Sequence, residues 1–331
     1  MELRDILSLL CTAYGGSGCE SAAGARITSL FPKYKYAYDA MGNLAVEVCP
    51  PKAGAPVIML EAHADEIGFI VQEVCADGRL LLSGVGGVDR RTLYGARVVF
   101  TAKKGPVEGT ICSDATEIEK ELYADIGYDS ESCPVSVGDR GYVKADFIAL
   151  DEKTFCSKAL DDRAGCAVLI KAASAIGAGL NCGVYAVFTV QEEIGLRGGA
   201  ASALGIHPDI AVCVDVSFAD APGIAEHKTG RFGGGPMIGI SPILSQKVTD
   251  DLCRAAKRIG IDWQTEIMGA STGTNADVIS RSDGGIATGL ISIPLRNMHT
   301  AGEIVCADDI LQSAKLLAAY VNEIGGGRSD V

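Results

Sequence analysis

The sequence has few positively charged residues. Its 331 residues include 29 lysines and arginines against 42 aspartates and glutamates, which gives a net charge of −13. Nucleic acids and anionic membrane surfaces are polyanions, so this balance argues against binding to either. The chain also lacks an apolar run of the ~18 residues that a membrane span needs, and it does not begin with the basic stretch of a signal peptide. We therefore expect neither nucleic acid nor a membrane as a partner.

The twelve cysteines lack the paired spacing of a disulfide framework or a zinc ribbon, and no CxxC occurs. Scattered cysteines of this kind are typical of small buried side chains in a reducing compartment, so we expect a cytoplasmic protein. With 48% hydrophobic residues, the chain can bury a full α/β core and has room for a second, smaller domain.

The pattern of apolar residues is typical of alternating helices and strands at both ends of the chain and differs in a segment between them. Helical periodicity at residues 2–13 and 20–30 precedes strand-like runs at 44–49 and 57–62. From Asp161 onward strands and helices alternate again, with amphipathic helices at 245–259 and 308–324. These parts together predict a doubly wound, mixed α/β sheet with helices on both faces.

The segment between these two parts has a different texture. From residue 68 to 150 short β-rich stretches separated by glycines predict a small β-barrel or sandwich. Within it, residues 117–132 look least ordered and predict a surface loop or a short helix. We expect one α/β domain formed by residues 1–67 and 155–331, with a β domain inserted at 68–154.

Acidic residues and a histidine follow three predicted strands at the point where each strand ends. Glu192 and Glu193 come after the apolar run 183–190, His63 follows 57–62, and Asp215 follows 210–214. In open α/β sheets, ligands bind at the carboxyl ends of the strands. Two neighbouring carboxylates at such an edge are tolerable if one of them coordinates a cation.

Two further segments carry the same kinds of side chain. Asp161 and Asp162 precede a predicted helix, and His299 follows the strand-like run 287–294. Two histidines, two aspartates and two glutamates suit zinc, cobalt or manganese, and they exceed what one tetrahedral ion needs. A two-metal site with a bridging carboxylate would use them and leave one glutamate as general base. A solvated acidic loop is the alternative, since the sequence does not show that these side chains converge.

Six segments, in this order and spacing, resemble metallopeptidase family forty-two, the dinuclear aminopeptidases that include glutamyl, deblocking and tetrahedral TET enzymes. The segments are HADEIGFIV, GRLLLSGVGGVDRRTLYGARVVF, SKALDDRAGCAVL, VQEEIGLRGG, VDVS and RNMHT. The resemblance implies a phosphorylase/hydrolase-like fold with an inserted β-barrel that supplies dimer contacts. It also implies hydrolysis of N-terminal residues from short peptides and a homo-oligomer, a dodecamer built from dimers.

The resemblance assigns roles to the candidate residues. Two divalent ions, zinc or cobalt with manganese as a further candidate, would be held by His63, Asp161 and Asp215 and by Asp161, Glu193 and His299. Asp161 would bridge the ions and Glu192 would be the general base. Asp65 would orient the imidazole of His63, and we interpret Asp162 as helix-start electrostatics.

One stretch departs from the family pattern. The family commonly has Gly-Thr-Asp between the last strands, where this chain has Gly273, Thr274 and Asn275. The loss of a carboxylate there predicts a cleft that is less hostile to acidic substrate side chains. The alternative is that Thr274 and Asn275 only shape a turn.

Three classes of function stay open at this point. A metal aminopeptidase is favoured. A metal-dependent deacylase of amino-acid conjugates would use the same site, whereas glycoside cleavage needs two carboxylates and no histidine ligands. A non-enzymatic assembly subunit would not need the six metal-site candidates.

Overall fold

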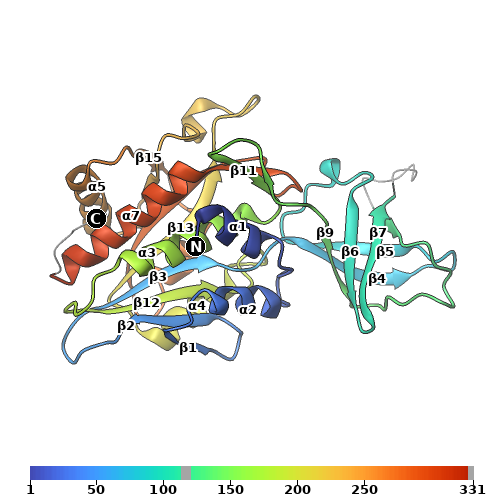
Figure 1. Ribbon diagram of the computed structural model, residues 1–331, viewed down its shortest axis with the longest axis horizontal. Coiled ribbons are helices and arrows are strands. Elements are labelled where there is room, and N and C mark those ends of the chain that lie inside the picture. Colours follow the sequence, from blue (N-terminus) through green and yellow to red (C-terminus); the bar gives the residue numbers. More distant parts are fainter. Residues whose placement is uncertain (113–120, 327–331) are drawn as a thin grey trace.

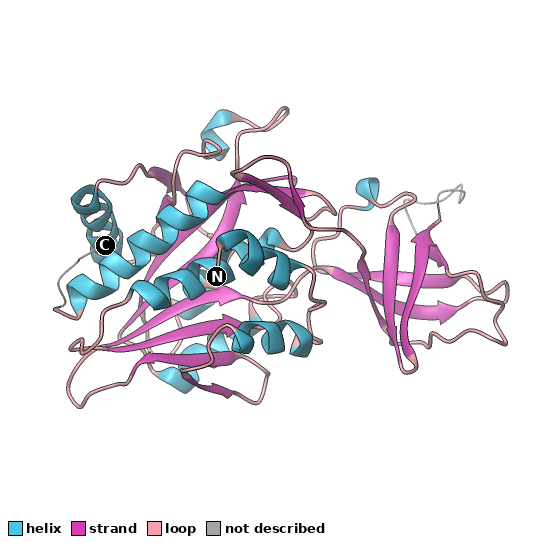
Figure 2. Cartoon of the chain, viewed as in Figure 1, coloured by secondary structure: helices cyan, strands magenta, loops and turns pink. Residues whose placement is uncertain are grey.

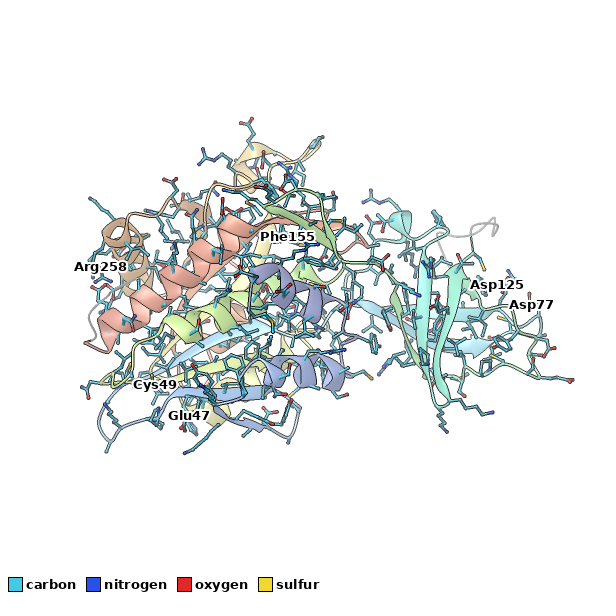
Figure 3. All side chains as sticks on the ribbon, in the orientation of Figure 1. Glu47, Cys49, Asp77, Asp125, Phe155 and Arg258 are labelled. Atoms are coloured by element: carbon cyan, nitrogen blue, oxygen red, sulfur yellow. The ribbon has the colours of Figure 1, made fainter. Side chains whose placement is uncertain are left out.

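The computed structural model describes residues 1–112 and 121–326. It consists of an α/β body and a smaller β-barrel that projects from one end of that body (Figure 1). Figure 2 shows the helices of the body packed over a central sheet, while the barrel consists mainly of strands. Among the side chains in Figure 3, Asp77 and Asp125 lie at the outer end of the barrel and Arg258 lies at the opposite end of the molecule.

An 11-stranded mixed sheet runs through the α/β body in the order β1-β2-β12-β3-β13-β16-β17-β11-β10, with β14 beside β16 and β15 beside β14. The mixed sheet predicted from the sequence is confirmed. Its strands are β1 (Lys35–Tyr38), β2 (Leu44–Cys49), β3 (Val57–His63), β10 (Ile148–Ala149), β11 (Thr154–Ser157), β12 (Gly183–Thr189), β13 (Ile210–Phe218), β14 (Met237–Ile240), β15 (Gln264–Ile267), β16 (Ala287–Arg296) and β17 (Glu303–Cys306).

The four central strands β12, β3, β13 and β16 are parallel to one another. Their register pairs Thr189 with His63 and Asp215 with Ser292. Because parallel strands end at the same edge of a sheet, the polar residues that follow them are brought to one place. The runs predicted at 44–49 and 57–62 correspond to β2 and β3.

Helices cover both faces of the sheet, as predicted. One face packs against α1 (Leu3–Cys11), α2 (Ser21–Ser29), α3 (Leu160–Ala175), α5 (Gln246–Ile259) and α7 (Ala307–Ile324), and the other against α4 (Arg197–Ile206) and α6 (Ala276–Ile279). Side chains alternate between these faces along each strand: Ile58 and Leu60 of β3 join the first core, whereas Met59 joins the second. By this alternation Glu61 and His63 share the face of Met59, on the side of α4 and α6.

Six strands close into the predicted barrel in the order β4-β5-β8-β7-β6-β9. A separate core fills it, with Phe69, Leu82 and Phe100 among its most buried side chains. The strands are β4 (Gly68–Val74), β5 (Leu80–Val85), β6 (Arg97–Ala102), β7 (Gly105–Ile111), β8 (Leu122–Asp125) and β9 (Arg140–Val143), with the short helix η1 (Arg90–Thr92) between β5 and β6. The domain limits stay a prediction; β10 already pairs with β11 of the large sheet.

One expectation within the barrel is wrong. Residues 117–120 lie outside the described part of the chain, but residues 122–125 form β8 instead of a loop or a helix. Leu122 and Ala124 point into the barrel core while Asp125 is exposed. The strand is short, and the acidic residues around it mask this alternation in the sequence.

The four helices predicted with residue limits are present as α1, α2, α5 and α7, with ends that agree within two residues, and the helix predicted after Asp162 is present as α3. Ser245 caps α5 at its start, and Gly260 ends it with a φ of 67°. In the described parts of the chain, none of the helices is long and apolar enough to cross a membrane. The cytoplasmic location stays a prediction.

Candidate metal centre

The five metal-ligand candidates lie together at the edge where the parallel strands end. His63, Asp161 and Asp215 form one group and Asp161, Glu193 and His299 form another, with the ligand atoms of each group within 4.8 Å of one another. The structure thus brings together side chains from five separate segments. Two imidazoles and three carboxylates are a donor set that fits zinc, cobalt or manganese.

Asp161 joins the two groups through its two carboxylate oxygens. Its Oδ1 lies 3.0 Å from Nε2 of His63, and its Oδ2 lies 3.1 Å from Nε2 of His299. His63 Nε2 is also 3.9 Å from Asp215 Oδ1, and His299 Nε2 is 3.4 Å from Glu193 Oε1. One carboxylate with an oxygen in each group is the arrangement that a bridging ligand between two ions requires.

The other nitrogen of each imidazole is turned away from the ligand groups and has a hydrogen-bond acceptor. His63 Nδ1 donates to the carbonyl oxygen of Asp65 at 3.2 Å and lies 3.4 Å from its Oδ1. His299 Nδ1 donates to the carbonyl oxygen of Gly87 at 3.0 Å. A proton held on Nδ1 leaves Nε2 free to bind a metal, which is how metal-bound histidines are usually oriented.

A glycine pair lets the barrel approach the ligands. Gly86 and Gly87 follow β5, and a Cβ at Gly87 would lie 2.7 Å from Nδ1 of His299, while one at Gly86 would lie 3.2 Å from Cβ of Glu193. Only glycine fits at this distance, and Gly86 also has a φ of 80°. The inserted barrel therefore contributes a backbone acceptor to the site.

The backbone around the site adopts conformations that side chains rarely favour. Non-glycine residues with positive φ include Ala159 (56°), Gln191 (57°), Leu196 (58°), Asn297 (58°) and His299 (62°). Such conformations cost about 1–3 kcal/mol each and persist where the surroundings hold them. Glu303 holds His299 by accepting its N–H, and other buried carboxylates accept N–H groups of the ligand-bearing segments.

Asp65 is the first of these carboxylates. It is fully buried, and its Oδ1 accepts from the Glu192 N–H at 2.9 Å and its Oδ2 from the Glu193 N–H at 3.2 Å. Ser17 Oγ donates to the same carboxylate at 2.6 Å. Asp65 therefore contacts the His63 ring and fixes the backbone that carries both glutamates.

Asp162 and Glu303 act on the other ligands in the same way. Asp162 accepts from Gly165 N–H at 2.9 Å, the helix-start contact expected of it, and also from His63 N–H at 3.2 Å. Glu303 accepts from Asp161 N–H at 3.0 Å and from His299 N–H at 2.8 Å. Glu303 was not predicted from the sequence, because its role depends on β17 lying between β16 and β11 in the sheet.

The carboxylates of the site favour the protonated, cationic form of the two imidazoles. Burial alone would lower the pKa of His299, but its hydrogen bonds to Asp161 and Glu193 outweigh burial and raise that pKa to about 11. Burial would raise the pKa of Asp161, but hydrogen bonds from His299 and His63 hold it well below its usual range. Metal ions would displace these imidazole protons, so metal binding is coupled to proton release.

Glu192 faces a cleft of about 530 Å³ that also exposes the ligand groups. Its side chain is 8% exposed. Burial raises its pKa to about 8, and the neighbouring carboxylates of Glu193 and Asp161 add to this, while His63 opposes it. A carboxylate that holds a proton near neutral pH is suited to both accept and return one.

The expectation for Asn275 is wrong, because its side chain does not line the cleft. It is 1% exposed, and its amide donates to Glu61 Oε1 at 2.7 Å and to Thr189 Oγ1 at 2.9 Å. An aspartate there would face the carboxylate of Glu61, and the amide removes this repulsion. The acidic residue that lines the cleft from this segment is Asp277.

Comparisons with known proteins identify relatives of this chain. Residues 42–316 match the M42 glutamyl aminopeptidase family. A putative aminopeptidase of Acetivibrio thermocellus is 39% identical over 86% of this chain and 87% of its own, and a lysyl aminopeptidase of Pyrococcus furiosus is 31% identical over 86% of each. The solved TET1 peptidase of Pyrococcus horikoshii, described as assembling into a tetrahedron or a large octahedral shell, has a TM-score of 0.84 at 29% identity and covers 97% of this chain and 99% of its own.

Substitution of the two adjacent glutamates should separate their roles. Glu192→Gln removes a proton acceptor but no ligand, so the variant should bind as much metal as the wild type while kcat falls roughly 100-fold or more. Glu193→Gln should weaken one metal group, and excess metal should restore part of its activity. Metal content, measured by atomic emission, and kcat of both variants test these roles. If Glu192→Gln loses metal and Glu193→Gln does not, then Glu192 is the ligand and Glu193 the general base.

Proposed function

The chain belongs to the M42 glutamyl aminopeptidase family and is an aminopeptidase, and from that premise we propose that it removes N-terminal residues from short peptides with two divalent ions per subunit. Zinc or cobalt suits the donor set, and manganese is a further candidate. His63 and Asp215 would hold one ion, Glu193 and His299 the other, and Asp161 both. The observation that supports this is the pair of ligand groups that share Asp161.

The chain's own residues supply the proton transfers. The bound ions would lower the pKa of a water molecule and polarise the peptide carbonyl. Glu192 takes a proton from the attacking water and returns it to the leaving amine nitrogen. Asp65 holds Glu192 in place by accepting a hydrogen bond from the main-chain N–H of Glu192. Asp65 does not itself exchange a proton.

Two alternative reactions differ in how much of the site they would use. A metal-dependent deacylase of amino-acid conjugates would need the same ligands, so only the substrate separates it from an aminopeptidase. A glycoside hydrolase needs two opposed carboxylates without metals. The two imidazoles, with Nε2 atoms beside Asp161, have no part in that mechanism.

Hydrolysis of aminoacyl-p-nitroanilides tests the proposal. The protein should cleave substrates with a free amino group, lose this activity in EDTA and regain it with added zinc, cobalt or manganese. N-acetylated forms of the same substrates serve as the control. Preference for the acetylated forms would indicate a deacylase, and activity unaffected by the chelator would contradict the metal mechanism.

The charge of the cleft predicts which N-terminal residues it favours. Asp277 lines the cleft, whereas none of its described lining residues is a lysine or an arginine. Partial burial would raise the pKa of Asp277, but hydrogen bonds from Ser271, Thr272 and Gly273 outweigh burial and lower that pKa below its usual value. The negative charge should favour basic over acidic N-terminal side chains.

Asp277→Asn should therefore lower the ratio of kcat/KM for lysyl over glutamyl substrates by roughly fivefold, because an ion pair in a solvated cleft contributes about 1 kcal/mol. Asp77→Asn, at the outer end of the barrel (Figure 3), is the matched control for net charge. If both variants keep the wild-type ratio, Asp277 does not face the bound side chain.

We also propose a homo-oligomer, a dodecamer built from dimers with the barrel at the dimer contact. Two solved TET1 structures support it, one described as a dodecamer in the asymmetric unit and one as assembling into a tetrahedron or a large octahedral shell. The apolar side chains of Tyr94, Tyr128 and Val137, which are exposed on the barrel, also support it. Light scattering at micromolar concentration should give about twelve times the 34.3 kDa of one chain. A monomer alone would contradict the proposal.

A further inference from the structure

Glu303 connects two metal-ligand segments that are far apart in the sequence. It is the first residue of β17, is 2% exposed, and lies opposite Ser157 of β11 in the sheet. Its two carboxylate oxygens accept from the N–H groups of Asp161 and His299, at 3.0 and 2.8 Å. Both residues belong to the ligand group that also contains Glu193.

Neither of these two segments is held in place by a regular backbone pattern. The N–H of Asp161 lies at the start of α3, where helices have no internal acceptor, and the dihedral angles of Asp161 are not helical. His299 has a φ of 62° in the loop between β16 and β17. A carboxylate between the two N–H groups therefore fixes the distance between the two ligands.

Glu303 does not line the cleft that Glu192 faces; it is 2% exposed and borders a second, smaller pocket that shares Asp161, Glu193 and His299 with that cleft. We propose that Glu303 is a positioning residue that sets the affinity of the Asp161–Glu193–His299 group for its ion. The proposal rests on the two-ion centre of the proposed function. It explains what sets the metal affinity of the Asp161–Glu193–His299 group.

Glu303→Gln tests the proposal, because an amide keeps one acceptor oxygen and replaces the other with a donor. One of the two main-chain hydrogen bonds must then be lost and replaced by a contact between two donors. Glu61→Gln is the matched control: Glu61 is also 2% exposed, and its carboxylate accepts from the side chains of Thr189, Asn275 and Cys213.

Isothermal titration of the metal-free proteins with zinc gives the affinity of each equivalent. In Glu303→Gln one of the two zinc equivalents should lose roughly 10- to 100-fold in affinity, the usual effect of removing a group that orients metal ligands. The other equivalent should change far less, although it shares Asp161. At saturating zinc, kcat should recover while KM stays at its wild-type value.

Wild-type affinity for both equivalents in Glu303→Gln would overturn the proposal, as would an equal loss in Glu61→Gln. If the wild type binds only one ion, the proposed two-ion function is contradicted, whereas the role of Glu303 is not. Hydrogen exchange in the metal-free wild type then tests the positioning role by itself and does not depend on a variant that folds. The amides of Asp161 and His299 should exchange at least about tenfold more slowly than that of Thr300; equal rates would overturn the role.

Discussion

Repulsion between buried carboxylates is the constraint on which the site depends. Asp161, Glu193 and Asp215 are gathered at one edge of the sheet, and burial together with neighbouring acids raises the pKa of Asp215 well above its usual value. Such a cluster is stable only where positive charge or hydrogen-bond donors offset it. Imidazoles and backbone N–H groups supply part of this offset, and divalent cations would complete it.

The fold supplies the donors because loops meet where parallel strands end. Asp65, Asp162 and Glu303 each accept main-chain hydrogen bonds from segments that carry ligands, so these carboxylates fix the ligands and are themselves stabilised. The barrel takes part through the carbonyl oxygen of Gly87. The barrel thereby helps to orient a ligand of the candidate metal centre.

Much of the fold and of the candidate site could be predicted from the sequence, since strand ends and helix starts are local patterns. The β-rich insert and the polar residues after the central strands needed only periodicity and composition. Glu303 could not be found, because its importance arises from two N–H groups more than 100 residues apart in the chain. Asn275 was misjudged because position in a loop does not show whether a side chain points inward, and β8 was missed because four residues carry too little pattern.

The claim that two cations complete the charge balance is tested most directly by anomalous diffraction from crystals grown with zinc, measured on both sides of its absorption edge. Two peaks should appear about 3.5–4 Å apart, one beside His63 and Asp215 and one beside Glu193 and His299, with Asp161 between them. A single peak, or peaks away from Asp161, would contradict the account.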